Sequence, residues 1–166
     1  MNLLVFRHGP AGDSEAWKAE GRDDRLRPLT SEGKKDTREA VAGLARLLPR
    51  LDIIISSPLV RATQTAEILA REYHCEIVTR DTLVPDSDPE ESVTSLAELG
   101  ENQVVAIVGH EPHLSRFISY LLGGQRSSFV DLTKAGACLL ELKTVGRAKA
   151  TLKWLLTRRE LARLGQ

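Results

Sequence analysis

Short runs of hydrophobic residues alternate along the chain with longer segments in which hydrophobic residues recur at helical spacing. The runs predict four buried strands, at Leu3–Phe6, Ile53–Ile55, Cys75–Val78 and Val104–Val108. The segments between and after them predict helices, with starts marked by Thr30-Ser31-Glu32 and by Asp88-Pro89-Glu90-Glu91. Strands that are hydrophobic throughout, separated by helices, are typical of a parallel sheet covered on both faces.

The last part of the chain has a different pattern. Residues 137–142 and 149–156 resemble strands joined by a turn near Gly146, which predicts a hairpin or two late strands, and 158–164 predicts a short helix. Residues 11–27 are polar and weakly patterned, so we expect a loop or irregular helix there. The predicted fold is therefore a single α/β domain over residues 1–166, a three-layer α/β/α sandwich around a mainly parallel sheet.

Composition narrows the class of protein. The 166 residues include 23 Lys and Arg and 23 Asp and Glu, so the formal net charge is zero, which argues against broad binding of nucleic acid or of an anionic membrane. No hydrophobic run is long enough to span a bilayer, and the first residues do not have the pattern of a signal peptide. We therefore expect a cytoplasmic protein in which Cys75 and Cys138 are reduced and buried.

Three segments place basic or imidazole side chains where predicted strands end. Arg7-His8-Gly9 follows the first strand, Ser57 to Arg61 follows the second, and Gly109-His110 follows Val104–Val108. The carboxyl ends of parallel strands meet at one edge of the sheet, where ligands bind. The sequence therefore predicts an active site at this edge.

These residue types suit a phosphoryl group. Arg7 and Arg61 can supply forked donors and positive charge, His110 can donate another hydrogen bond, and Gly9 would let the backbone approach the anion. A neutral His8 could then attack phosphorus and form a phosphohistidine intermediate, and the two arginines should lower its pKa. Because the arginines supply the charge, the chemistry requires no metal and no other cofactor.

The segment His110-Glu111-Pro112-His113 also invites a metal-site interpretation. It is one residue short of His-Glu-x-x-His, and its proline would break a helix through it, so we predict no metal there. Pro112 instead suits a helix start whose N–H groups favour anions. We expect His113 near the rim of the pocket.

Four motifs occur in order along the chain: Leu4-Val5-Phe6-Arg7-His8-Gly9, Leu29-Thr30-Ser31-Glu32-Gly33, Ser57-Pro58-Leu59-Val60-Arg61-Ala62-Thr63-Gln64-Thr65-Ala66 and Val108-Gly109-His110. Together they resemble the histidine phosphatase (phosphoglycerate mutase-like) superfamily. The short chain, with Arg27-Pro28-Leu29-Thr30 and Gly123-Gly124, resembles its SixA-type phosphohistidine phosphatase branch. The resemblance implies a phosphoglycerate mutase-like fold and a phosphate pocket of Arg7, His8, Arg61 and His110, with His8 as nucleophile. The implied substrate is phosphohistidine on a histidine phosphotransfer domain or a similar phosphorylated protein.

The chain departs from the wider superfamily in the segment that would carry an acidic proton donor. In this chain that segment is short and consists of Leu83–Glu91 only. Asp86 is the candidate proton donor in it, and Asp88 is better explained as a helix cap. An imidazole leaving group needs less protonation than a sugar alkoxide, which fits a phosphohistidine substrate.

Two other functions stay open at this point: a phosphatase of a small phosphate ester or sugar phosphate, in which Asp86 would matter, and a non-catalytic module that binds phosphate. The arginines Arg22, Arg25 and Arg27 are either a solvated surface paired with nearby aspartates or an outer rim that contacts an acidic protein. We interpret Arg158-Arg159-Glu160 as a solvated helix face.

Overall fold

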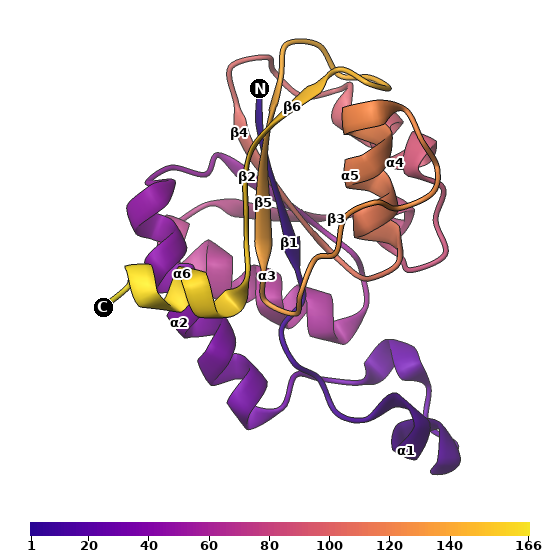
Figure 1. Ribbon diagram of the computed structural model, residues 1–166. Coiled ribbons are helices and arrows are strands. Elements are labelled where there is room, and N and C mark those ends of the chain that lie inside the picture. Colours follow the sequence, from indigo (N-terminus) through magenta and orange to yellow (C-terminus); the bar gives the residue numbers. More distant parts are fainter.

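A six-stranded sheet forms the centre of the molecule, whose computed structural model describes residues 1–166 (Figure 1). Its strands are β1 (Asn2–Arg7), β2 (Ile53–Ser56), β3 (Glu76–Thr79), β4 (Val104–Gly109), β5 (Ala137–Leu142) and β6 (Ala150–Leu156). The strand order is β3-β2-β4-β1-β5-β6. Neighbours from β3 to β1 are parallel, whereas β5 and β6 pair antiparallel. The prediction of a mainly parallel sheet with a late hairpin is confirmed.

Helices cover both faces of this sheet. They are α1 (Ser14–Ala19), α2 (Ser31–Leu47), α3 (Val60–Tyr73), α4 (Pro89–Leu96), α5 (His113–Gly123) and α6 (Arg158–Leu164), with short 3-10 turns η1 (Asp24–Leu26) and η2 (Asp81–Leu83). Helices α2, α3 and α6 pack on one face, and α4 and α5 on the other (Figure 1). This arrangement confirms the three-layer α/β/α prediction. No helix has the length and hydrophobicity that crossing a membrane requires.

The hydrophobic strands have a simple explanation in this layering. Side chains alternate between the two faces of a strand, and in β1, β2 and β4 both faces are buried, whereas the edge strands β3 and β6 keep exposed residues. Leu4 and Phe6 of β1 pack in the core beneath α2 and α3, whereas Leu3 and Val5 pack in the core beneath α5. Both predicted thiols are free, but only Cys138 is buried.

The predicted helix starts at Thr30 and Asp88 are confirmed by their caps. The Thr30 side chain accepts a hydrogen bond from the backbone N–H of Gly33, and the Asp88 side chain accepts one from Glu90. The hydrophobic residues Val93, Leu96, Ala97 and Leu99, followed by Gly100, predict a helix that ends at Gly100, but α4 ends at Leu96. Its backbone changes there to i→i+3 hydrogen bonds, so the chain continues as tight turns instead of helix.

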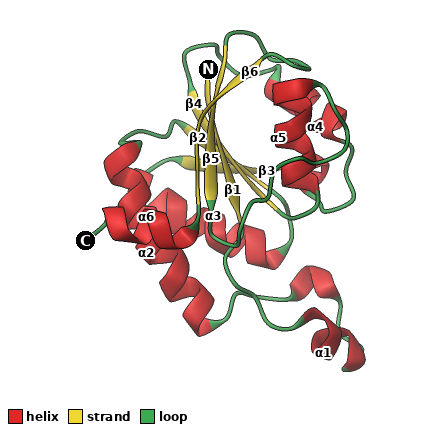
Figure 2. Cartoon of the chain, in the orientation of Figure 1, coloured by secondary structure: helices red, strands yellow, loops and turns green.

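Residues 11–27 extend from the body as a narrow arm of loop and short helical turns, with α1 at its far end (Figure 2). Neither α1 nor η1 contains a buried residue. The arm is held internally by the Trp17 indole N–H, which donates to the Asp23 carbonyl, and by Arg22, whose guanidinium lies 3.4 Å from the Trp17 ring centroid. The expectation of a loop or irregular helix is confirmed.

Candidate active site

The register of the parallel strands brings the predicted residues together. The backbone N–H of His8 donates to the Gly109 carbonyl (3.1 Å), and that of Ser57 donates to the Val108 carbonyl (2.9 Å). The chain segments leaving β1, β2 and β4 are therefore locked side by side. As a result His8, Ser57 and His110 emerge as neighbours, although more than 40 positions separate each from the next in the sequence.

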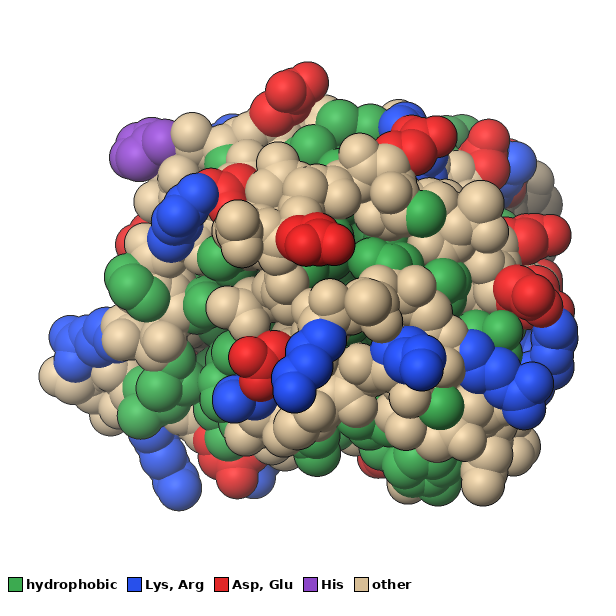
Figure 3. All heavy atoms as spheres, turned by 90° about the horizontal axis from the view of Figure 1, so that it is seen from above, with side chains coloured by type: hydrophobic (Ala, Val, Ile, Leu, Met, Phe, Trp, Pro, Cys, Tyr) green, Lys and Arg blue, Asp and Glu red, His purple; other side chains and the backbone are tan.

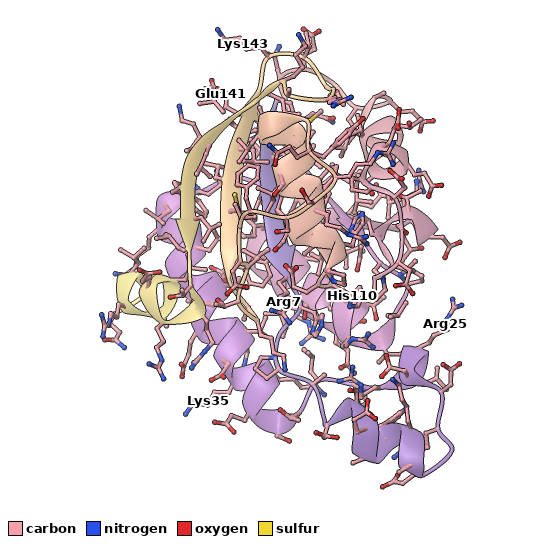
Figure 4. All side chains as sticks on the ribbon, turned by 45° about the vertical axis from the view of Figure 1, so that its right-hand side comes forward. Arg7, Arg25, Lys35, His110, Glu141 and Lys143 are labelled. Carbon is pink, nitrogen blue, oxygen red and sulfur yellow. The ribbon has the colours of Figure 1, made fainter.

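A cavity of about 510 Å³ lies at this edge, and Arg7, His8, Arg61 and His110 all line it. Figure 4 shows Arg7 and His110 beside each other below the strands. The remaining lining residues come from the arm, from the start of the β4–α5 connection and from the loop before β5: Ala11, Gly12, Asp13, Ser14, Arg27, Glu111 and Lys134.

The hydrogen bonding of His8 fixes which ring nitrogen can react. Its Nδ1 lies 2.7 Å from the Gly9 carbonyl oxygen, which can only accept a hydrogen bond. Nδ1 therefore carries the proton of the neutral ring, and Nε2 keeps its lone pair. The ring is buried, with its centroid 4.9 Å from that of His110.

Burial is the main reason that His8 stays neutral. The pKa of His8 is lowered to about 3 in all, mainly by burial and also by the charges of Arg61 and Arg7, whereas the hydrogen bond to Gly9 acts in the opposite direction. The prediction that the arginines lower this pKa is correct in direction, but burial is the larger cause. Burial likewise lowers the pKa of His110 to about 2, with a smaller effect from His8.

Ser57 orients His110, a role that the sequence did not suggest. The Ser57 hydroxyl lies 2.9 Å from His110 Nε2 and accepts a long hydrogen bond from the Leu59 N–H. The Ser57 hydroxyl has no other acceptor for its proton, so we infer that it donates to His110 Nε2. The neutral His110 ring then carries its proton on Nδ1.

Three buried N–H donors at the cavity have no acceptor in the chain: Arg7 Nε, Arg61 Nε and His110 Nδ1. The arginines are anchored through their other nitrogens, since Arg7 donates to the Leu132 carbonyl at 2.8 Å and Arg61 to the Asp24 carbonyl at 2.9 Å. Unpaired buried donors are costly, and such groups call for a specific explanation.

Asp24 joins the arm to the cavity by bridging two arginines. Its carboxylate lies 3.1 Å from Arg61 Nη2 and 2.8 Å from Arg27 Nε. Arg27 therefore belongs to the site, whereas Arg22 and Arg25 are exposed and do not line the cavity. Figure 4 shows Arg25 on the arm, well apart from Arg7 and His110. The solvated-surface interpretation fits Arg22 and Arg25 and is wrong for Arg27.

Gly9 does not have the predicted geometry. Its backbone N–H donates to Thr65 Oγ1 at 3.1 Å, and it does not line the cavity. A Cβ at this position would collide with Thr37 Oγ1 and press on the Gly33 carbonyl. Gly9 is needed here because α2 packs closely against the end of β1, and the expected approach to an anion is wrong.

The acid at the cavity is Glu111 and not Asp86. Asp86 is exposed and absent from the lining, because the η2–α4 connection passes outside the cavity. Glu111 lines it, accepts a 2.7 Å hydrogen bond from Ser115, and has its pKa raised by burial. The sequence signal that points to Glu111 is its position next to His110.

His113 is not at the rim. It is fully buried, its Nε2 lies 2.8 Å from the Ser92 hydroxyl, and its ring stacks on Phe117. Pro112 is the N-cap of α5, so the chain turns into the helix between His110 and His113 and sends the two rings into different surroundings. No group of three or more His, Cys, Asp or Glu gathers anywhere in the chain as a metal site.

Comparisons with known proteins are consistent with this geometry. A family model described as the histidine phosphatase superfamily (branch 1) matches residues 3–84. An uncharacterized protein of Picosynechococcus sp. is 32% identical over 142 residues, which cover 82% of each chain.

Solved structures share the fold over nearly the whole chain. The protein histidine phosphatase SixA complexed with tungstate superposes with a TM-score of 0.78 at 22% identity, covering 97% of this chain and 99% of that one. The alpha-ribazole phosphatase from Shigella flexneri gives a TM-score of 0.72 at 19% identity, covering 95% and 97%. The fold is thus phosphoglycerate mutase-like, as the sequence resemblance implied.

Proposed function

Because this chain belongs to the histidine phosphatase superfamily, we propose that it hydrolyses protein phosphohistidine through a phosphoryl intermediate on His8. Family membership makes the chain a phosphatase. The nucleophile, the roles of the other residues and the substrate are inferences from the cavity.

The observation that carries the proposal is the set of three unpartnered donors around His8. A phosphoryl group presents three oxygens and negative charge, and Arg7 Nε, Arg61 Nε and His110 Nδ1 offer three N–H groups and two charges. Binding the phosphoryl group would give acceptors to these N–H donors, whose burial without a partner costs free energy. Tungstate, bound in the SixA structure of the same fold, is an oxyanion of similar shape.

The first step transfers the phosphoryl group to the enzyme. The Nε2 lone pair of His8 attacks phosphorus as the bond from phosphorus to the substrate nitrogen breaks, and the departing imidazole takes up a proton from solvent. The Gly9 carbonyl keeps the Nδ1 proton of His8 in place and stabilises the positive charge that the ring acquires. Arg7 and Arg61 hold the charge on the phosphoryl oxygens.

The second step returns the enzyme to its starting form. A water oxygen attacks phosphorus, the bond to His8 Nε2 breaks, and the water proton leaves with the phosphate product or through solvent. His8 regains its neutral Nδ1–H form, which burial and the two arginines favour.

Two features support a phosphohistidine substrate. No residue of the η2–α4 connection lines the cavity, so no long segment covers the site from that side. The arm contributes Ala11 to Ser14 to one wall, but α1 has no buried residue and points away from the body (Figure 2). A side chain presented on a protein surface could therefore reach His8.

One observation favours a second candidate, hydrolysis of a small phosphate ester. Glu111 lines the cavity with its pKa raised by burial, and a carboxylic acid in that position could protonate an alkoxide leaving group. The alpha-ribazole phosphatase of the same fold acts on a substrate of another kind, as its name states. Phosphohistidine, whose leaving group needs less help, remains the first choice.

The test compares phosphate release from a phosphohistidine-bearing protein with release from a panel of phosphate esters. We expect a large preference for phosphohistidine in the native enzyme and loss of all release in His8→Ala. A preference for esters would move the assignment to a metabolite phosphatase. Binding of a phosphorylated protein without any turnover would support the non-catalytic alternative.

A further inference from the structure

A second groove borders the catalytic cavity and is not used by the chemistry above. It has a volume of about 700 Å³ and shares two lining residues, Arg7 and Lys134, with the cavity. It continues from the site toward α6 and the first half of α2. Its other lining residues are Pro10, Asp36, Asp131, Thr133, Thr157, Arg158 and Arg159.

The wall between the two hollows is a turn fixed to the end of β1. The backbone N–H of Ala135 donates to the carbonyls of both Arg7 and His8, at 3.2 Å each. Ala135 has a φ of 54°, so the chain turns sharply there and leaves the preceding residue, Lys134, on the boundary. A ligand that reaches His8 and extends past Lys134 therefore enters the groove.

Cationic side chains outnumber acidic side chains along the groove. Four lining residues are cationic and two are acidic. The acid Asp36 is neutralised by Arg158, whose Nη1 lies 2.9 Å from its carboxylate. Lys134 and Arg159 are exposed and have no ion-pair partner, and Asp131 is the remaining acid. The free charge on this surface is therefore positive.

We propose that this groove binds the acidic segment of a protein substrate next to its phosphorylated residue, with Arg159 and Lys134 contacting the carboxylates. The inference rests on the proposed function and names the part of the substrate that the cavity does not hold. The lining contains no large hydrophobic side chain, which suits an exposed polar peptide. Arg159 lies exposed on α6, as predicted, and in this proposal it contacts the substrate.

The arm is the alternative surface that could bind the acidic segment of the substrate. Arg22 and Arg25 are exposed there, but Arg22 stacks on Trp17 and pairs with Glu20, and neither arginine lines the cavity or the groove. The groove, in contrast, is continuous with the site through two shared residues.

The experiment uses three substrates: free phosphohistidine and two phosphohistidine peptides whose flanking residues are glutamate in one and glutamine in the other. They are given to the native enzyme, to Arg159→Glu, and to a matched control, Arg163→Glu, which reverses an exposed charge on the same helix outside the groove. Arg22→Glu with Arg25→Glu tests the arm. The readout is kcat/KM at low and high salt.

We expect the native enzyme to prefer the glutamate peptide by about fivefold to tenfold at low salt, with the preference shrinking as salt is raised. Arg159→Glu should abolish the preference and leave free phosphohistidine unaffected, whereas Arg163→Glu should retain it. Equal rates on both peptides, equal effects of the two α6 variants, or loss only in the arm variant would overturn the proposal. Absence of turnover on all three substrates would instead refute the proposed function, and the groove assignment with it.

Discussion

The two edges of the central sheet each carry a cavity, yet only one has the features of a site. The cavity at the carboxyl edge measures about 510 Å³, and one at the amino edge, lined among others by Glu101, Glu141 and Lys143, measures about 390 Å³. Figure 4 shows Glu141 and Lys143 at the opposite end of the molecule from Arg7 and His110.

The two cavities differ in whether their polar lining residues are buried, and not mainly in volume. At the amino edge no polar lining residue is buried, and acidic and basic side chains are interspersed over that end of the surface (Figure 3). At the carboxyl edge His8, Arg61 and His110 are buried, and two of them keep an unpartnered N–H. Burying such groups costs stability, so their presence together indicates a function that repays it.

After the loss of all release expected for His8→Ala, the largest effect should come from Arg61→Ala at the carboxyl edge. The change removes one charged donor of the cavity and the anchor of Asp24, so kcat/KM for a phosphohistidine peptide should fall on the order of 10²–10³-fold. Lys143→Ala at the amino edge is the matched control and should leave the rate unchanged. A loss below about threefold in Arg61→Ala would remove the main reason for distinguishing the two edges.

Glu111→Gln should have an effect that depends on the leaving group. If Glu111 is the acid of the site, an alkyl phosphate should be hydrolysed about 100-fold more slowly, while a phosphohistidine peptide should change little. Asp86→Asn should alter neither rate, because Asp86 is exposed outside the cavity. A selective loss on the ester in Asp86→Asn instead would show that the wrong acid had been chosen.

The pH dependence of stability should also come from the carboxyl side of the molecule. Burial lowers the pKa values of His8, His110 and His113 to about 3, 2 and 4. An unfolded histidine has a pKa near 6.5, so from about pH 6.5 down to 4 the unfolded chain binds protons that the folded chain does not. Stability should therefore be highest above pH 6.5 and fall as the pH decreases, by at most about 1.4 kcal/mol per pH unit for each histidine.

Urea unfolding between pH 7.5 and 4.5 measures this slope. His113→Gln should flatten it, because one buried titrating group is lost. His74→Asn is the control: it replaces an exposed residue that caps α3 with φ of 54°, a conformation that asparagine tolerates, and it should leave the slope as it is. The same slope in native protein and in His113→Gln would contradict the burial argument.

The smallest effect is expected at the amino edge. Glu141 pairs with Lys153 at 3.2 Å, and both side chains are 47% exposed. Exposed ion pairs contribute little, so Glu141→Gln should change the free energy of unfolding by less than about 1 kcal/mol and leave activity unchanged. A loss of activity in this variant would give the amino edge a function that its geometry does not suggest.

Much of the fold could be predicted because local pattern and tertiary burial agree. The central strands β1, β2 and β4 are buried on both faces, so they are continuous hydrophobic runs, and the caps at Thr30 and Asp88 depend on residues close in sequence. The end of α4 was misplaced because an exposed helix end is set by small differences between α and 3-10 hydrogen bonds.

The residues of the site likewise include some that the sequence predicts and some that it does not. Arg7, His8, Arg61 and His110 follow strand ends, and a parallel sheet gathers such positions at one edge. The bridge from Asp24 to Arg61, the close packing at Gly9 and the groove beside Arg159 depend on contacts between distant segments, which no local pattern encodes.

The central claim is that Nε2 of His8 carries the phosphoryl group during turnover. The most direct measurement is to quench the enzyme during hydrolysis of a phosphohistidine peptide under alkaline conditions and to identify the phosphorylated nitrogen by NMR of ¹⁵N-histidine-labelled protein. We expect one acid-labile phosphoryl group, on Nε2 of His8, because Nδ1 is held as a donor to the Gly9 carbonyl. Phosphorylation of Nδ1, of His110, or of no histidine would contradict the central claim.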